Sequence, residues 1–275
     1  MKYCELVDSL VKIGVSDAES EAELILNHLF DVNRASIVFD RGREYDADKI
    51  APILDKREQK IPLQHILGRW YFMGREFLVS PDCLIPRPDT EILVERAIKE
   101  LKTRGRVADL CTGSGCIGIS MLVYRPDISS MLLCDISEKA LKMAEKNALL
   151  NGVSKECTLL CTDITKGLPK MELDMIVSNP PYIPSADIST LSDEVKKEPM
   201  LALDGGDDGL DIIRFLLSEG LDYLSPDGKM LIEFGYDQGA KIDTLCAKIK
   251  EMGKITTYEI IKDYGGNDRC LLVNK

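Results

Sequence analysis

Apolar residues in the first 68 positions recur every three to four residues, which is the spacing of amphipathic helices. The segments that follow this pattern are 6–13, 22–29, 47–60 and 62–68. Ser16 and Glu19 match a capping box, so we expect the second helix to begin there. Gly68 follows the last apolar residue, as glycine does at many helix C-termini. The pattern predicts a small helical domain over residues 1–68.

Residues 69–83 form a different pattern. Apolar and aromatic residues lie on both sides of Gly74, which predicts a β-hairpin. We expect this hairpin to link the helical domain to a larger domain over residues 84–275. The larger domain opens with a proline-flanked loop, after which Asp89 or Thr90 can cap a helix.

From Val107 onward, short apolar runs alternate with helical segments. Such alternation predicts an α/β fold, a mostly parallel sheet with helices on both faces. The expected strands are 107–110, 131–134, 158–161, 175–178, 229–234, 256–261 and 270–273. The expected helices between them are 116–124, 137–150, 211–224 and 238–252. Only a short loop separates the last two strands, so the seven-stranded sheet should end in an antiparallel pair.

Composition and charge narrow the function. The chain of 275 residues has 45% hydrophobic and 29% charged residues, and its net charge is -11. A charge this negative argues against a protein that grips a nucleic-acid backbone over a wide face. Nine scattered cysteines and two histidines support neither a disulfide framework nor a metal site. No apolar run approaches membrane-spanning length, so we expect a cytoplasmic monomer with no membrane contact.

A glycine-rich turn follows the first strand of the sheet. Gly113, Gly115 and Gly118 fit G-x-G-x-x-G, which lets the backbone approach a ligand closely at a helix N-terminus. Asp135 ends the second strand about 20 residues further on, where a carboxylate can accept hydrogen bonds from ribose hydroxyls. Asp163 ends the third strand and can accept from an adenine amino group. Together these residues indicate an adenosine-containing cofactor.

The fourth strand ends abruptly in Asn179-Pro180-Pro181-Tyr182. Neither proline can donate to a sheet ladder, and a residue before proline favours extended geometry. The turn should therefore hold the Asn179 amide and the Tyr182 ring rigidly. Ligands of open α/β sheets bind at the carboxyl ends of the strands, so this turn should meet the cofactor. A methyltransferase acting on a planar NH2 group has a use for such a turn, whereas a nicotinamide-dependent oxidoreductase has none.

These features resemble class I S-adenosylmethionine-dependent methyltransferases, and in particular the release factor glutamine methyltransferases (the HemK/PrmC family). The stretches that carry the resemblance are 62–68, 72–74, 84–91, 109–115, 179–182, 198–199, 202–203, 205–206, 208–210 and 233. Adenine-N6 methyltransferases share the Asn-Pro-Pro-Tyr signature and stay open as an alternative, as does an NAD-dependent oxidoreductase. Cys111 departs from the glycine of many members, and we expect it to alter packing only.

The resemblance implies a substrate, a cofactor and a set of site residues. The enzyme would transfer a methyl group from S-adenosylmethionine to the side-chain nitrogen of the glutamine in the Gly-Gly-Gln motif of peptide chain release factors, leaving S-adenosylhomocysteine. The N-terminal helices would help to dock the release factor. The residues implied to contact the cofactor are Cys111, Thr112, Gly113, Ser114, Gly115, Asp135, Asp163, Ile164 and Asn179. Those implied to hold the glutamine are Asn179, Pro180, Pro181 and Tyr182, with Asn179, Pro180 and Tyr182 as catalytic residues.

Overall fold

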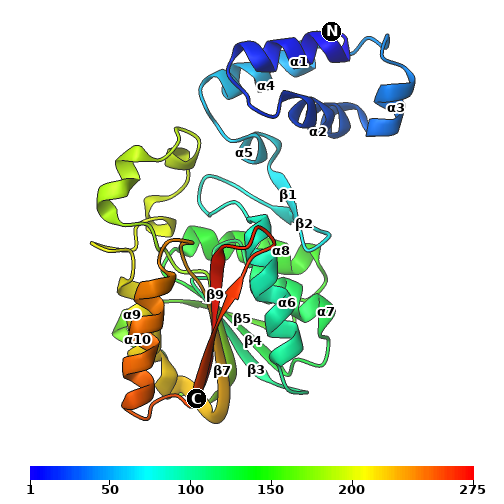
Figure 1. The fold of residues 1–275 in the computed structure, drawn as a ribbon. Coiled ribbons are helices and arrows are strands. Elements are labelled where there is room, and N and C mark those ends of the chain that lie inside the picture. Colours follow the sequence, from blue (N-terminus) through cyan, green and yellow to red (C-terminus); the bar gives the residue numbers. More distant parts are fainter. The chain divides into compact units, whose positions relative to one another are not determined.

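The computed structural model describes residues 1–275 as two compact units (Figure 1). The first unit contains Met1–Arg69 and, from much later in the sequence, Ser192–Lys197. The second contains Trp70–Leu191 and Glu198–Lys275. No helix combines the length and the apolar character that crossing a membrane requires.

The first unit is a helical bundle. Its helices are α1 (Tyr3–Lys12), α2 (Ala18–Phe30), α3 (Arg34–Phe39), α4 (Ala47–Glu58) and α5 (Leu63–Leu67). The expected start of the second helix is wrong, because the Asp17 carboxylate, not Ser16, accepts from the backbone N–H of Ser20. The pattern missed α3, since this short helix buries only Ile37 and therefore shows no periodicity.

Arg57 binds the late segment within the first unit. Its side chain is 2% exposed and donates to Glu21 Oε1 at 2.7 Å and to Glu194 Oε1 at 3.0 Å. A buried guanidinium needs such partners, because an unpaired buried charge costs several kcal/mol. Residues 192–197 therefore belong to the same unit as the helices, although they lie far from these helices in the sequence.

The second unit is built on a seven-stranded sheet in the order β5-β4-β3-β6-β7-β9-β8. The strands are β3 (Arg106–Leu110), β4 (Ser130–Asp135), β5 (Cys157–Cys161), β6 (Leu173–Ser178), β7 (Leu224–Glu233), β8 (Thr257–Lys262) and β9 (Asp268–Asn274). Only β9 runs antiparallel to its neighbours β7 and β8. The predicted α/β fold with a terminal antiparallel pair is confirmed.

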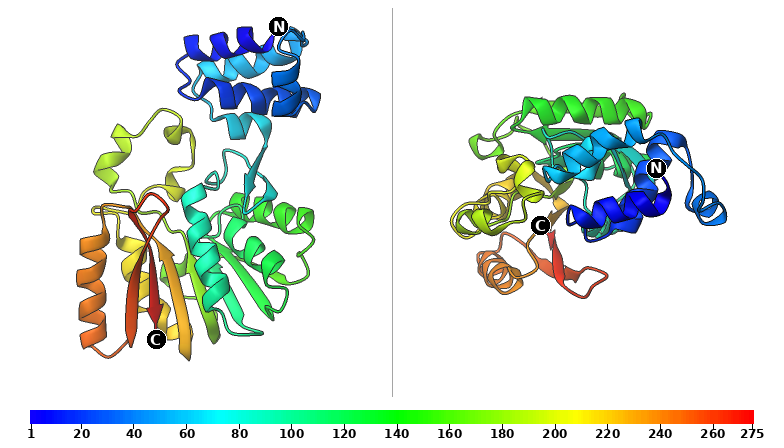
Figure 2. Two further views of the ribbon diagram at one scale, coloured as in Figure 1. Left: turned by 45° about the vertical axis from the view of Figure 1, so that its right-hand side comes forward. Right: turned by 90° about the horizontal axis from the view of Figure 1, so that it is seen from above.

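Helices cover both faces of this sheet (Figures 1 and 2). On one face, α6 (Glu91–Glu100), α7 (Cys116–Tyr124) and α8 (Glu138–Leu150) bury a core that includes Leu93, Met131 and Val177. On the other face, α9 (Asp211–Ser218) and α10 (Gly239–Glu251) bury a second core that includes Ile176 and Phe234. A separate two-stranded sheet, β1 (Arg69–Phe72) with β2 (Arg75–Leu78), precedes α6.

Two element boundaries differ from the expected ones. The helix expected over 211–224 ends at Ser218, and a 3₁₀ turn over Gly220–Tyr223 follows it. Strand β7 begins at Leu224 rather than at residue 229, although Pro226 and Gly228 interrupt the apolar pattern there. The register between β6 and β7 shifts at this point, which accommodates the irregular residues.

The order of the strands determines where a ligand can bind. From β3 the chain moves outward through β4 to β5, and it then returns to place β6 on the other side of β3. The connections after β3 and β6 therefore leave in opposite directions, and a crevice opens at the carboxyl ends of these two strands. The glycine-rich turn and the Asn-Pro-Pro-Tyr turn both begin at this crevice.

Candidate active site

A cavity of about 500 Å³ lies at the carboxyl ends of the central strands. This volume suits a small-molecule ligand. The predicted site residues that line it are Cys111, Thr112, Gly113, Ser114, Asp135, Asp163, Ile164, Asn179 and Pro181. Gly115, Pro180 and Tyr182 are not part of its lining. The fold thus brings residues of the two motifs to one cavity.

A buried carboxylate holds the glycine-rich turn. Asp109 Oδ2 accepts from the Thr112 hydroxyl at 2.6 Å and from the Gly118 N–H at 3.0 Å. Burial raises the pKa of Asp109 to about 7, and the bonds from Thr112 and Gly118 oppose the rise. Gly118 also lets α7 approach the sheet, because a Cβ there would lie 2.5 Å from Leu133. Both ends of the turn are therefore fixed before any ligand binds.

Asp135 lies on the cavity wall at the end of β4. Its Oδ2 accepts from the Gly113 N–H and its Oδ1 from the Ser137 N–H, both at 2.8 Å. Burial raises the pKa of Asp135, and these backbone N–H groups oppose the rise. Each carboxylate oxygen has a further lone pair. Asp135 can therefore accept hydrogen bonds from a ligand while it tethers the glycine-rich turn.

The wall beside Asp135 is apolar. Ile136, which is 51% exposed, and the buried Ile164 both line the cavity. Asp163 caps the 3₁₀ turn Ile164–Lys166 by accepting from the N–H and hydroxyl of Thr165. The Thr165 hydroxyl is the main reason why the pKa of Asp163 is lowered. Two isoleucines next to two carboxylates suit a ligand with a flat apolar ring and polar edges.

The turn after β6 fixes the Asn179 amide. The Ser178 hydroxyl donates to the Leu110 carbonyl at 2.6 Å, which ties the end of β6 to the end of β3. Asn179 Nδ2 then donates to the Thr90 hydroxyl oxygen at 3.2 Å. Asp89 or Thr90 was expected to cap α6; Thr90 occupies the N-cap position, but its side chain makes no capping bond. The Thr90 hydroxyl oxygen accepts the hydrogen bond from Asn179 instead.

Tyr182 turns its hydroxyl into the protein. This hydroxyl donates to Glu233 Oε1 at 3.3 Å. Burial raises the pKa of Tyr182, and the nearby Glu233 charge adds to the rise. The implied role of Tyr182 in holding the substrate glutamine stays a prediction.

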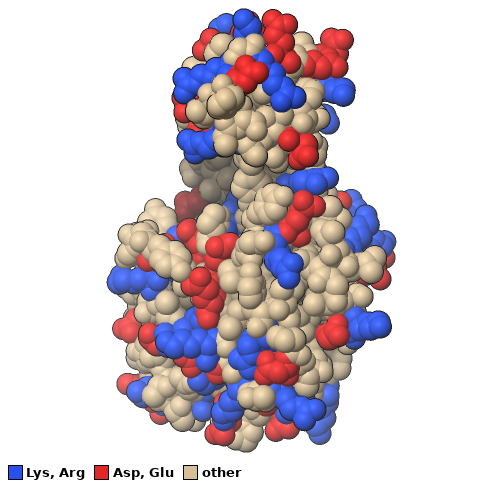
Figure 3. Space-filling view, turned by 90° about the vertical axis from the view of Figure 1, so that its right-hand side faces the viewer, with Lys and Arg blue, Asp and Glu red and all other residues tan.

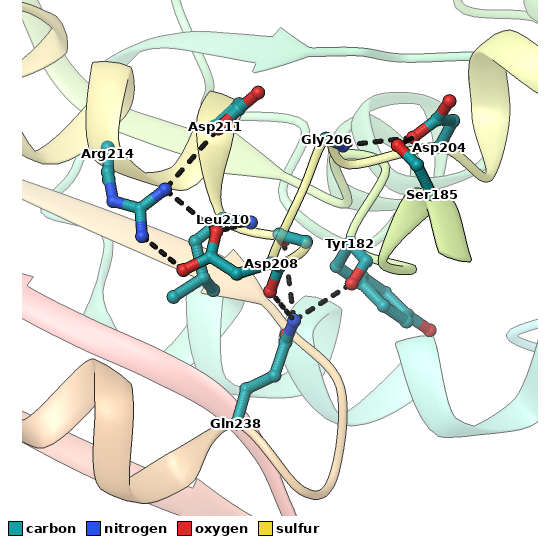
Figure 4. A network of polar contacts seen from close by, with 10 residues as sticks. Tyr182, Ser185, Asp204, Gly206, Asp208, Leu210, Asp211, Arg214 and Gln238 are labelled. Atoms are coloured by element: carbon teal, nitrogen blue, oxygen red, sulfur yellow. Dashed lines mark hydrogen bonds and ion pairs between the residues drawn. The ribbon is translucent and has the colours of Figure 1, made fainter. Parts of the chain in front are cut away.

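A polar network anchors the backbone around Tyr182 (Figure 4). Gln238 Nε2 donates to the Tyr182 carbonyl at 2.9 Å and also reaches the Gly209 carbonyl at 3.4 Å. Arg214 Nη1 donates to Asp208 Oδ1 at 2.8 Å, which holds the same loop from its other side. The loop that leaves the Asn-Pro-Pro-Tyr turn therefore returns to it and is closed at its base.

Sequence reasoning gave no role to two buried polar residues near the site. Glu198 accepts from the Ile85 N–H at 2.9 Å and pairs with Arg87, which fixes the proline-flanked loop. Asn147 lies on the buried face of α8 and donates to the Ser114 carbonyl at 2.9 Å. For Asn147 a signal was available, because it is an asparagine on an otherwise apolar helix face. Glu198 was marked only by the family resemblance of 198–199, because its partners lie more than 100 residues away in the sequence.

The cavity also has an exposed apolar rim. Met200 and Leu201, which form a 3₁₀ turn with Ala202, are 57% and 64% exposed and line the cavity. Apolar side chains left in water beside a polar site mark a place where a larger partner can bind.

Comparisons with known proteins agree with this geometry. The Methyltransferase small domain family matches residues 88–197, and the PrmC N-terminal domain family matches residues 5–68. A methyltransferase from Pyrococcus furiosus shares the fold, with 18% identity, a TM-score of 0.58, and coverage of 80% of this chain and 98% of its own. The ribosomal protein L11 methylase from Lactobacillus delbrueckii subsp. bulgaricus is similar, with 23% identity, a TM-score of 0.51, and coverage of 71% and 82%. Fold and site define a methyltransferase with a Rossmann-like sheet.

The curated relatives narrow this class. The release factor glutamine methyltransferase of Moorella thermoacetica is 37% identical over 273 residues, 98% of this chain and 95% of the relative. The one from Aquifex aeolicus is 33% identical over 274 residues, again 98% and 95%. The chain belongs to the release factor glutamine methyltransferase family of enzymes, which confirms the resemblance found in the sequence.

Gly209 should tolerate no side chain. Its φ is +77°, and a Cβ would lie 2.2 Å from the Tyr182 carbonyl oxygen. Gly253 has a similar φ of +71° but open space around it, so it is a matched control. We expect Gly253→Ala to lower the free energy of unfolding by about 1 kcal/mol through backbone strain alone. Gly209→Ala should lower it by about 3 kcal/mol or more, as measured by urea unfolding. Equal losses would contradict the close contact.

Cys111 has a φ of +60°, a conformation that favours glycine. The expectation that this residue affects packing only is therefore incomplete. We expect Cys111→Gly to be more stable than Cys111→Ala by about 1 kcal/mol, because glycine relieves the strain and both variants lose the thiol. At an unstrained position alanine is the more stable of the two. Urea unfolding of the pair measures the sign, and a more stable alanine variant would refute the strain.

Proposed function

We propose that this enzyme transfers a methyl group from S-adenosylmethionine to the side-chain amide nitrogen of the glutamine in the Gly-Gly-Gln motif of peptide chain release factors. One observation carries the proposal. Asn179 lies on the wall of the same cavity as Asp135 and Gly113, and its NH2 group is already bound to Thr90. Its oxygen is therefore available to a planar NH2 group beside the cofactor residues.

The cavity fits an adenosine-containing cofactor. Asp135 would accept from the ribose hydroxyls, and the apolar wall of Ile136 and Ile164 would pack on the adenine. Gly113, with no side chain to obstruct the approach, would let the rest of the cofactor come close to the N-terminus of α7. When bound, S-adenosylmethionine supplies an electrophilic methyl group on a positively charged sulfur.

The work left to the protein is to position an amide nitrogen. An amide is a poor nucleophile because its lone pair is delocalised into the carbonyl. Asn179 Oδ1 and the Pro180 backbone carbonyl would each accept one N–H of the substrate glutamine. These bonds would orient the nitrogen and stabilise the positive charge that grows on it in the transition state. Positioning of this kind can lower a barrier by roughly 7–11 kcal/mol, so no strong base is required.

Several features favour a protein substrate over a nucleic acid. The net charge is -11, and on the face drawn in Figure 3 basic and acidic side chains are intermixed. The apolar rim of Met200 and Leu201 suits contact with a folded partner. The relatives are named for release factors. In this proposal the N-terminal helices help to dock the release factor, and the enzyme works as a monomer in the cytoplasm.

Transfer of a labelled methyl group tests the proposal directly. With S-adenosylmethionine, the protein should label a bacterial release factor and fail to label the same factor with its Gly-Gly-Gln glutamine changed to alanine. A DNA duplex serves as the third substrate. Labelling of DNA and not of the release factor would favour an adenine-N6 methyltransferase instead.

Asn179→Ala should lower kcat at least about 100-fold, because the substrate nitrogen loses one of its two oriented acceptors. The Kd for S-adenosylhomocysteine, measured by calorimetry, should change less than fivefold. Asn151→Ala is a matched control, since Asn151 bonds to Glu76 and Asn147 and does not line the cavity. Wild-type turnover by the Asn179 variant would show that the assigned role is wrong.

A further inference from the structure

Two side chains at the cavity wall, Asn179 and Thr90, can each either donate or accept the hydrogen bond between them. The Asn179 amide has an oxygen and an NH2 group of nearly the same shape, so its direction is decided by its partners. The Thr90 hydroxyl can either donate or accept. A hydrogen bond between two such groups has no preferred direction. A third group that can only accept would give it one.

Glu233, the last residue of β7, is such a group. Its side chain is buried, at 1% exposed, and Oε1 accepts from Tyr182. Oε2 is buried and has no hydrogen-bond partner, so it is open to a nearby hydroxyl. Above its pKa of about 7 the Glu233 carboxyl is mostly ionised, and an ionised carboxylate offers lone pairs and no proton. A hydroxyl beside Glu233 therefore turns its proton toward the carboxylate.

The Thr90 hydroxyl is one of the groups that stabilise the Glu233 charge. Burial raises the pKa of Glu233 to about 7, and the Thr90 hydroxyl, the Arg269 guanidinium and the Tyr182 hydroxyl oppose the rise. Arg269, from β9, is itself held by Asp89 and Asp263, each at 3.2 Å. Three side chains thus support the carboxylate, and the Asp89 charge works against it.

The direction of the Thr90 hydroxyl determines how the Asn179 amide is oriented at the cavity. A threonine that gives its proton to Glu233 has only lone pairs left for Asn179. Asn179 must then direct its NH2 group inward, as the 3.2 Å bond from Nδ2 to Thr90 Oγ1 requires. The amide oxygen is left facing the cavity, where an acceptor for the substrate N–H is needed.

We propose that Glu233 is a positioning residue that sets the direction of the Glu233–Thr90–Asn179 chain of hydrogen bonds and so presents the Asn179 oxygen to the substrate. This deepens the proposed function and rests on it. Through the Tyr182 hydroxyl, the same carboxylate also fixes the other end of the Asn-Pro-Pro-Tyr turn.

Glu233→Gln is the decisive variant. Glutamine keeps the shape but carries an NH2 group that can donate to Thr90, so the direction of the chain is no longer enforced. We expect kcat for release factor methylation to fall at least tenfold, while KM and the Kd for S-adenosylhomocysteine change less than threefold. Glu100→Gln is the matched control, because that carboxylate pairs with Lys229, four residues earlier on β7, and lies outside the cavity.

Thr90 variants test the middle of the chain. Thr90→Val keeps the shape without the hydroxyl, so it should lower kcat about as much as Glu233→Gln. Thr90→Ser keeps the hydroxyl and should retain activity within about threefold. If Glu233→Gln does not fold, the valine and serine variants of Thr90 still test the proposal. Equal activity of the valine and serine variants would overturn the proposal.

A second readout does not depend on the substrate. Hydrogen exchange of the Asn179 side-chain NH2, followed by NMR in ¹⁵N-labelled protein, should be slow in the wild type and at least tenfold faster in Glu233→Gln. Unchanged exchange, or wild-type kcat in Glu233→Gln, would overturn the proposal. A wild-type protein that labels no release factor would refute the proposed function alone, because the exchange rates would still report the direction of the Asn179 amide.

Discussion

The parallel pairing of β3 with β6 is the constraint on which the second unit depends. Leu110 lies opposite Ser178 in the register, and the Ser178 hydroxyl reinforces the pairing through the Leu110 carbonyl. Both strands end at this pair, and Cys111 and Asn179 follow them. A shift of one strand by one residue would turn its side chains to the opposite face of the sheet. The cofactor turn and the Asn-Pro-Pro-Tyr turn meet only because this register is kept.

The sequence predicted the strands and their ends well, because buried parallel strands read as short apolar runs bounded by glycine and proline. It also predicted that Gly113, Asp135 and Asn179 share one crevice, since all three lie at the carboxyl ends of predicted parallel strands. It could not predict that Tyr182 turns inward or that Thr90 leaves α6 uncapped. Those outcomes depend on Glu233, which lies 51 residues from the tyrosine and 143 from the threonine (233 − 182 and 233 − 90). Long-range contacts of this kind leave no local pattern.

Three carboxylates around the cavity are withdrawn from water by the sheet and its covering helices. Burial raises the pKa of Asp109, Asp135 and Glu233 alike, and each is stabilised by hydrogen bonds from nearby groups. Donors that are already in place hold such groups in one orientation, so little reorganisation is needed when a ligand binds. These bonds keep the site ordered without a histidine among its lining residues.

The membership of Ser192–Lys197 in the first unit has a consequence for dividing the protein. The chain passes from one unit to the other near residue 69, near residue 191 and again near residue 197. A fragment that begins at Trp70 would therefore keep these six residues but lose the helices that hold them, and Glu194 would lose its bond to Arg57. The complementary fragment ending at Arg69 would leave one side of the Arg57 guanidinium without its carboxylate. Neither unit is a self-contained stretch of sequence, so separating them demands a cut and a rejoining rather than a single truncation.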